Sequence, residues 1–174
     1  MKQNNTSSGN FSNLKKAVIL DGLQDTDIAV LSQHGNFITF KNGEVIMQEG
    51  ENADSMYIFL DGEVEVSKNL TLKLSSRSFG HVEKAMNKLK ASDAWVFGEM
   101  SLFQTEPRSA TVTALTECKL FEISRNEFKK FCREKPLAGI IILERIAAIL
   151  SSRLRKSNQD VLKLSTALSI ALNR

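Results

Sequence analysis

Short strand-like runs separated by tight turns fill the middle of the sequence and restrict the folds open to it. The segments FITFKNGEVIMQEG and SMYIFLDGEVEVSK each hold two β-rich runs, separated by Asn42-Gly43 and by Asp61-Gly62. A third segment, SATVTALTECKLFEIS, has its turn near Thr116-Glu117. Asn-Gly and Asp-Gly favour two-residue hairpins, and strands with turns every eight to twelve residues or so are typical of a sandwich or barrel. We therefore expect a mainly β domain.

Helical patterns precede this β region. Residues 14–35 predict two short helices that separate at Asp21-Gly22, and the second begins at Asp25 or Thr26. Residues 1–13 are rich in Asn and Ser and lack the apolar core of a signal peptide. We expect them to form a flexible tail, and we expect the protein to be cytoplasmic.

A long helix follows the β region. Ser124 and Glu127 form a capping box ahead of a first helix, and Pro136 ends that helix and is well suited to begin the next. Neither proline nor glycine follows Gly139. Residues 136–174 are therefore predicted to form one long helix, or a helix with a single break.

One face of this helix carries the heptad pattern of a coiled coil. Residues on that face alternate spacings of four and three, and only Ser157 among them is polar. We call this row the seam: Leu143, Ala147, Leu150, Leu154, Ser157, Val161, Leu164, Leu168 and Ala171. Near Leu143 extra isoleucines also favour packing on the chain's own barrel. Beyond Ser157 little of the chain is left to cover the seam, so we expect homodimerisation through residues 143–171.

Residues 68–96 form an atypical segment with a looser pattern. Leu70, Leu72 and Leu74 favour one strand, and Val82–Lys90 favours a helical turn or two. Six basic residues against two acids leave two interpretations, a solvated excursion or a lid or partner surface.

The composition excludes several kinds of function. With 174 residues, 42% of them hydrophobic, and a net charge of +3, one globular domain is expected, without a strong field for nucleic acid or membrane. His34 and His81 are too few for a barrel metal site, and His34 is expected to end a helix. Cys118 and Cys132 are not spaced as a metal clip or redox pair, so we expect buried, reduced thiols.

The stretch FGEMSLFQTEPRSATV, residues 97–112, concentrates the chemistry of the sequence. Gly98 would let a ligand approach the backbone, and the free N–H groups of the following turn would point at an anion. Arg108 offers a fork of donors that matches phosphate oxygens, whereas an ionised Glu99 only accepts hydrogen bonds and suits hydroxyl groups. A sugar phosphate would satisfy both residues. The alternative is that Glu99 and Arg108 pair with each other across the loop.

The same stretch closely resembles the phosphate-binding cassette of the cyclic nucleotide-binding domain family, in the Gly-Glu start, the Glu-to-Arg spacing of nine and the Pro-Arg-small-Ala-Thr finish. We call residues 97–112 the cassette. The resemblance extends over residues 14–135, apart from the segment 68–96. It implies an antiparallel β-roll or jelly-roll barrel (a double-stranded β-helix) with N-terminal helices and a long C-terminal dimerisation helix.

The resemblance also implies roles for individual residues. Glu99 would accept from the ribose 2′-hydroxyl, and Arg108 would pair with the cyclic phosphate. Gly98, Ser109 and Ala110 would supply backbone N–H groups, with the Ser109 hydroxyl as an added donor. Met100 completes the predicted cassette contacts.

Two further contacts are implied on the long helix. The pattern SSRLRKSNQDV aligns with the dimer helix of the catabolite activator branch, where Ser157 and Asn158 would contact the adenine base. The alternative is that Ser157 only sets the register of a coiled coil. The family usually has an aspartate where this chain has Trp95, which is expected to be a wall or core residue, or else to stack on the base.

The expected function is a non-enzymatic sensor of cAMP, or of cGMP, that converts binding into a change of helix and dimer geometry. No room for a DNA-binding helix-turn-helix follows Pro136, so the output would belong to a partner protein or to an output domain outside this sequence. One alternative is an interaction module that no longer depends on ligand. Another is a small barrel enzyme of the cupin type, which would need a transition metal as cofactor.

Overall fold

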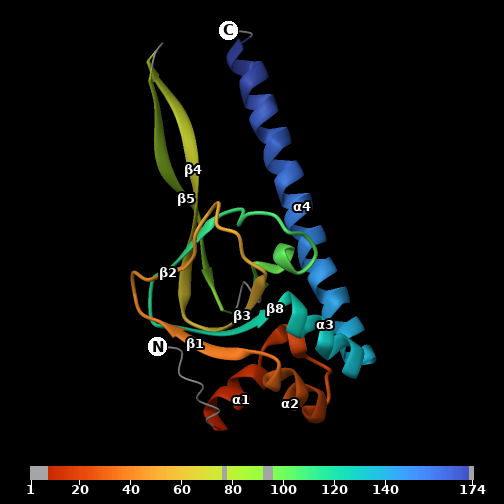
Figure 1. Cartoon of the computed structure of the whole chain (residues 1–174). Coiled ribbons are helices and arrows are strands. Elements are labelled where there is room, and N and C mark those ends of the chain that lie inside the picture. Colours follow the sequence, from red (N-terminus) through yellow and green to blue (C-terminus); the bar gives the residue numbers. More distant parts are fainter. Residues whose placement is uncertain (1–7, 76–77, 92–95, 173–174) are drawn as a thin grey trace.

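The computed structural model describes residues 8–75, 78–91 and 96–172, and folds them into two sheets with helices at both chain ends (Figure 1). The strands are β1 (Asn36–Phe40), β2 (Val45–Met47), β3 (Ser55–Asp61), β4 (Glu63–Ser75), β5 (Ser78–Lys90), β6 (Val96–Phe97), β7 (Thr111–Ala114) and β8 (Cys118–Ser124). The α-helices are α1 (Ser8–Lys15), α2 (Asp25–Gln33), α3 (Arg125–Glu134) and α4 (Pro136–Leu172). Two short 3₁₀ helices are η1 (Val18–Leu20) and η2 (Glu99–Leu102).

Both sheets are antiparallel and have four described strands each, in the orders β1-β8-β3-β6 and β2-β7-β4-β5. Most neighbours in a sheet are distant in sequence, as β1 with β8 and β2 with β7. This arrangement confirms the predicted mainly β, jelly-roll fold class with helices on its flanks.

The turns at Asn42-Gly43 and Asp61-Gly62 do not close hairpins, contrary to the prediction, and neither does the turn at Thr116-Glu117. The strands on either side of each turn belong to different sheets. Gly43 (φ 86°) and Gly62 (φ 108°) do take the left-handed conformation expected of tight turns. The dipeptides therefore mark the points where the chain crosses between sheets, because each strand finds its partner far along the chain.

The predicted helical turns at Val82–Lys90 are wrong, since these residues belong to strand β5. β5 pairs with β4 from Glu63↔Lys90 to Ser75↔Ser78. A partner strand that satisfies the backbone outweighs a local helical preference. The β4–β5 hairpin extends beyond the barrel on the same side as the free end of α4 (Figure 1). Trp95 lies outside the described residues.

The flexible tail predicted for residues 1–13 is wrong from Ser8 onward, because α1 begins there. The predicted helix from Leu14 is instead the end of α1 followed by η1, while α2 begins at Asp25 as predicted. Phe11 packs against the main core, and Leu14 is fully buried in it. Burial of these two apolar side chains holds the segment in place. Residues 1–7 lie outside the described part of the chain.

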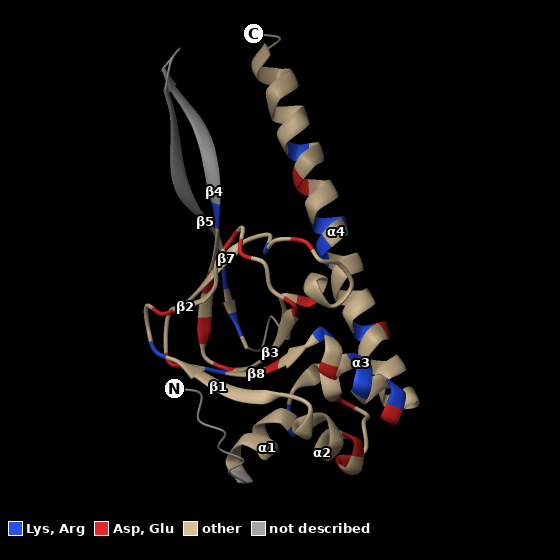
Figure 2. Ribbon diagram, in the orientation of Figure 1, with Lys and Arg blue, Asp and Glu red and all other residues tan. Residues whose placement is uncertain are grey.

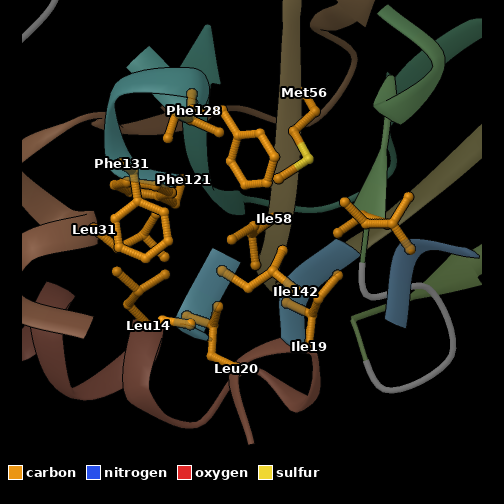
Figure 3. Packing of buried hydrophobic residues seen from close by; sticks show 14 of the residues in the cluster. Leu14, Ile19, Leu20, Leu31, Met56, Ile58, Phe121, Phe128, Phe131 and Ile142 are labelled. Atoms are coloured by element: carbon orange, nitrogen blue, oxygen red, sulfur yellow. The ribbon is translucent and has the colours of Figure 1, made fainter. Parts of the chain in front are cut away.

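The main core lies between the flanking helices and the sheet that contains β3 and β8 (Figure 3). Phe128 and Phe131 of α3 are buried in it. The Ser124 hydroxyl accepts from the Glu127 amide at 3.3 Å and so caps α3. The interior of the barrel forms a second core, to which Cys118 belongs, whereas Cys132 is only half-buried. Burial raises the pKa of both thiols.

α4 is one helix of 37 residues that begins at Pro136, as predicted. Its first turns pack on the core through Ala138, Ile142 and Ile146, and every described residue from Ser151 onward is exposed. The last turns, from Leu164, carry no charge (Figure 2). Among the described helices none is long and apolar enough to cross a membrane.

Candidate functional site

The cassette connects β6 to β7 and is fixed at both ends by the barrel. Phe97 pairs with Tyr57 of β3 at its start. Near its end the Arg108 amide donates to the Glu51 carbonyl (2.9 Å), and the Gly50 amide donates to the Arg108 carbonyl (3.0 Å). The backbone at Arg108 is therefore held against the loop that precedes β3.

Gly98 begins the turn in the left-handed conformation, with φ 73° and ψ 10°. A Cβ at this position would lie 2.4 Å from Arg108 Nη1 and 3.2 Å from the Ser55 carbonyl oxygen. Both the backbone conformation and the close approach of the guanidinium require glycine here. The absence of a side chain at Gly98 thus leaves room for the Arg108 guanidinium, and Gly98 is also the N-cap of η2.

Arg108 is buried, with 6% of its surface exposed. Its Nη1 donates to the Gly98 carbonyl (3.2 Å) and to Ser101 Oγ (3.0 Å), and its Nη2 donates to Ser55 Oγ (3.2 Å). The guanidinium also lies 5.7 Å from the centre of the Tyr57 ring. Burial lowers the pKa of Arg108, and the nearby Tyr57 and acidic side chains oppose this effect.

Glu99 is buried as well, at 4% exposure, but it faces a different partner. Its Oε1 accepts from Arg153 Nη1 of α4 at 2.7 Å, and Arg153 Nη2 donates to the Val96 carbonyl at 2.7 Å. Glu99 and Arg108 therefore hold separate partners, and the alternative of a mutual pair across the loop is wrong. Sequence reasoning missed Arg153, because nothing local connects a basic residue of α4 with a carboxylate 54 positions earlier.

Arg125 is a second residue that sequence reasoning missed. Its Nε donates to the Ser101 carbonyl (2.7 Å), its Nη1 to Thr105 Oγ1 (2.9 Å) and its Nη2 to the Gln104 carbonyl (2.5 Å). Because Arg125 is the first residue of α3, it ties the cassette to that helix. The only signal in the sequence is its place directly after the capping serine.

The other predicted contact residues are spread between the cassette and α4. Within the cassette, Ala110 is buried, whereas Ser109 and Met100 are exposed. Ser157 and Asn158 are exposed on α4, about one helical turn after Arg153. The structure thus brings Gly98, Glu99, Arg108 and Ala110 together in one folded segment. The base contacts of Ser157 and Asn158 stay a prediction.

His34 is the C-cap of α2, as predicted, and joins α2 to α3. Its Nδ1 lies 3.0 Å from Glu127 Oε2 and its Nε2 lies 3.1 Å from Glu134 Oε2. These two carboxylates raise the pKa of His34, with Glu127 as the largest cause and burial opposing. In the described ranges, no three His, Cys, Asp or Glu side chains are grouped to hold a metal ion.

The geometry combines a buried cationic fork, Arg108, with a buried hydroxyl acceptor, Glu99, in the cassette. Arg108 supplies N–H donors for an anion, and the Glu99 carboxylate can accept from hydroxyl groups. A ligand that bears both a phosphate and a vicinal hydroxyl would use both.

Comparison with known proteins agrees with this chemistry. A family model described as "Cyclic nucleotide-binding domain" matches residues 37–135 of the chain. A "CRP-like cAMP-activated global transcriptional regulator" of Mycobacterium tuberculosis is 27% identical over 87% of this chain and 61% of its own length. The "cAMP-dependent protein kinase regulatory subunit" of Dictyostelium discoideum is 32% identical over 68% of this chain and 34% of its own length.

A solved structure described as a cyclic nucleotide-binding domain from Methylobacillus flagellatus has a similar fold. The TM-score is 0.71 at 24% identity, and the alignment covers 87% of this chain and 82% of that one. The chain spans less than two thirds of the length of the two curated relatives.

Proposed function

Since the chain belongs to the cyclic nucleotide-binding domain family, we propose that it is a non-enzymatic, cytoplasmic sensor of a cyclic nucleotide, with cAMP preferred over cGMP. In this proposal Arg108 pairs with the cyclic phosphate, and Glu99 accepts from the ribose 2′-hydroxyl. Gly98, Ser109 and Ala110 supply the remaining contacts with the phosphate and ribose.

The burial of Arg108 without a carboxylate partner carries the proposal. Its direct partners are a carbonyl and two hydroxyls, and within the described part of the chain no carboxylate lies at ion-pair distance. A buried guanidinium is costly unless an anion compensates it. A ring phosphate, with one negative charge, would be that anion.

The choice of cAMP rests on smaller observations. Both curated relatives named above carry cAMP in their names. Ser109, Ser157 and Asn158 supply small polar side chains for the base and phosphate, and the latter two would come from the dimer helix. The Ser109 hydroxyl is also compatible with a guanine amino group, so cGMP remains the second ligand to test.

The step from binding to output would run through Arg153 and α4. A ribose hydroxyl at Glu99 would share the carboxylate with Arg153, and the position of α4 would respond. The exposed seam beyond Ser151 would form a homodimer, so that a shift of α4 becomes a change of dimer geometry. The nucleotide must favour one helix arrangement over the other for this to occur. A partner protein or a further domain would read the change.

Isothermal titration of the whole chain with cAMP and with cGMP tests the proposal. The expected result is saturable heat with cAMP, weaker binding of cGMP, and loss of both in Arg108→Leu. Arg133→Leu is the matched control, because Arg133 is an exposed arginine on α3 away from the cassette. No heat with either nucleotide would reject the sensor.

The second candidate is an interaction module that keeps the fold without depending on ligand. The Glu99–Arg153 ion pair favours it, because this pair already satisfies the carboxylate that a ribose would use. The same titration decides between the two candidates.

A further inference from the structure

A row of polar side chains continues from Arg108 into the sheet behind it. Ser55 and Tyr57 are on β3, and Glu122 is directly opposite Tyr57 on the neighbouring strand β8. Ser55 Oγ lies 3.2 Å from Arg108 Nη2 on one side and 3.2 Å from Glu122 Oε1 on the other. The Tyr57 hydroxyl reaches the same Glu122 oxygen at 3.0 Å. We call Ser55, Tyr57 and Glu122 the support.

The direction of each hydrogen bond in this row is determined by chemistry. An ionised carboxylate only accepts, so both Ser55 and Tyr57 donate to Glu122. Arginine only donates, so Ser55 uses its oxygen lone pairs for Arg108. A lone serine hydroxyl would be free to rotate, whereas Glu122 fixes it with its acceptor side toward the guanidinium.

The support places a negative charge close to Arg108 without neutralising it. Glu122 is one hydroxyl removed from the guanidinium, and Tyr57 presents its ring face 5.7 Å away. Within the described chain Arg108 uses three hydrogen bonds, which leaves two of its five N–H donors for a ligand. A carboxylate bound directly to Arg108 would take the place of a phosphate.

On the basis of the function proposed above, we infer that Ser55, Tyr57 and Glu122 are positioning residues that hold the Arg108 guanidinium in place for the phosphate of the nucleotide. Ser55 and Tyr57 are almost fully buried, at 8% and 7% exposure, so their geometry is imposed by the barrel. A purely structural role would be to satisfy the Tyr57 hydroxyl, with no effect on phosphate binding.

Calorimetric titration with cAMP separates these roles. Glu122→Gln and Ser55→Ala should each weaken binding about tenfold, as expected when a charge-assisted hydrogen bond to the guanidinium loses its support. Glu117→Gln, an exposed carboxylate in the turn before β8, is the matched control and should bind like the wild type. In an Arg108→Lys background the effect of Glu122→Gln should shrink, since lysine lacks the planar fork that the support orients.

The outcomes are distinguishable from those of the proposed function. If the wild type binds no cyclic nucleotide, the sensor proposal is wrong, and the proposed positioning role of the support is wrong as well. If the wild type binds and Glu122→Gln binds equally well, only the positioning role of the support is rejected. Tighter binding by Glu122→Gln would also overturn it, because Glu122 would then compete with the phosphate for Arg108.

A spectroscopic signature guards against misfolded variants. Tyr57 is the single tyrosine of the chain, so tyrosine labelled with ¹³C at Cζ alone gives one resonance, which reports on the hydroxyl group. Glu122→Gln should shift it by removing the charged acceptor of the hydroxyl, and Glu117→Gln should not. Addition of cAMP should shift the wild-type resonance, because the phosphate offsets the guanidinium charge beside the ring. If Glu122→Gln binds cAMP more weakly but leaves the Tyr57 resonance unchanged, the positioning role of the support is rejected.

Discussion

The two ends of the cassette differ in what holds their charged side chains. Arg108 is held by Gly98 and Ser101 of the cassette itself and by Ser55 of strand β3, through one carbonyl and two hydroxyl groups. Glu99 is held by an ion pair with Arg153, which comes from α4 and keeps 43% of its side chain exposed. One end is thus held by the cassette and strand β3, and the other is held by a residue of helix α4. We infer that the Arg108 end supplies affinity and that the Glu99 end supplies the coupling to α4.

The largest effect is expected on cAMP binding when the Arg108 side chain is removed. Arg108→Leu should weaken cAMP binding by one to two decades or more, since it removes a charged hydrogen-bond partner of the phosphate (about 1.5–3 kcal/mol per bond). The free energy of unfolding should change by less than about 1 kcal/mol, because the lost hydrogen bonds are offset by no longer burying an uncompensated charge. Calorimetry and thermal unfolding measure the two quantities. If the free energy of unfolding falls by as much as the free energy of cAMP binding, Arg108 does not serve mainly to bind the ligand.

The next effect concerns the exposed half of α4. Leu164 has 71% of its surface exposed in the single chain, and Leu164→Glu should weaken homodimerisation at least about tenfold by burying a charge in the seam. Sedimentation equilibrium measures the dimer constant. Gln159→Glu adds the same charge on an exposed part of the helix off the seam and should leave the dimer intact. Equal association of both variants would show that the seam is not the interface.

A smaller effect, on the free energy of unfolding, is expected when the Glu99–Arg153 ion pair is removed. Arg153→Met should lower the free energy of unfolding by about 1 kcal/mol, because a buried Glu99 carboxylate loses its partner while the exposed arginine was partly screened. Adding Glu99→Gln should recover part of that loss. Arg155→Met, on the exposed surface of the same helix, is the control. Urea unfolding of the wild type, Arg153→Met, Glu99→Gln and the double variant measures the cycle, and strictly additive losses would argue against the pair.

The smallest effect tests the junction of α2 and α3 by pH. Glu127 and Glu134 raise the pKa of His34 above its usual 6.5, so the charged ring stabilises the folded state. That contribution is complete below the unfolded-state pKa of 6.5 and is lost as pH rises through the higher folded-state value. The stability advantage of the wild type over His34→Gln should therefore be larger near pH 6 than near pH 9. Thermal unfolding measures it, and a pH-independent difference would contradict it.

The sequence predicted what depends on local pattern. Neighbouring residues alone determine the β-rich runs, the cap at Ser124, the helix start at Pro136 and the donor and acceptor types in the cassette. The resemblance placed Glu99 and Arg108 in one cassette, and the structure buries both side chains there.

What the sequence could not show depends on distant pairing. Val82–Lys90 is a strand because β4 is available as its partner, and a helical preference within the segment does not reveal that. Arg153 reaches Glu99 only because α4 packs along the cassette. The same holds for the support, since Ser55 and Glu122 are 67 positions apart and meet only where β3 lies beside β8.

The length of α4 beyond Arg153 makes it a lever. The nineteen residues that follow Arg153, up to Leu172, extend about 28 Å along the helix axis. A tilt of about 10° with Arg153 as the pivot would move the far end by about 5 Å, roughly half the distance between two packed helices. A displacement too small to see at the carboxylate of Glu99 would thus be large at the tip of the molecule.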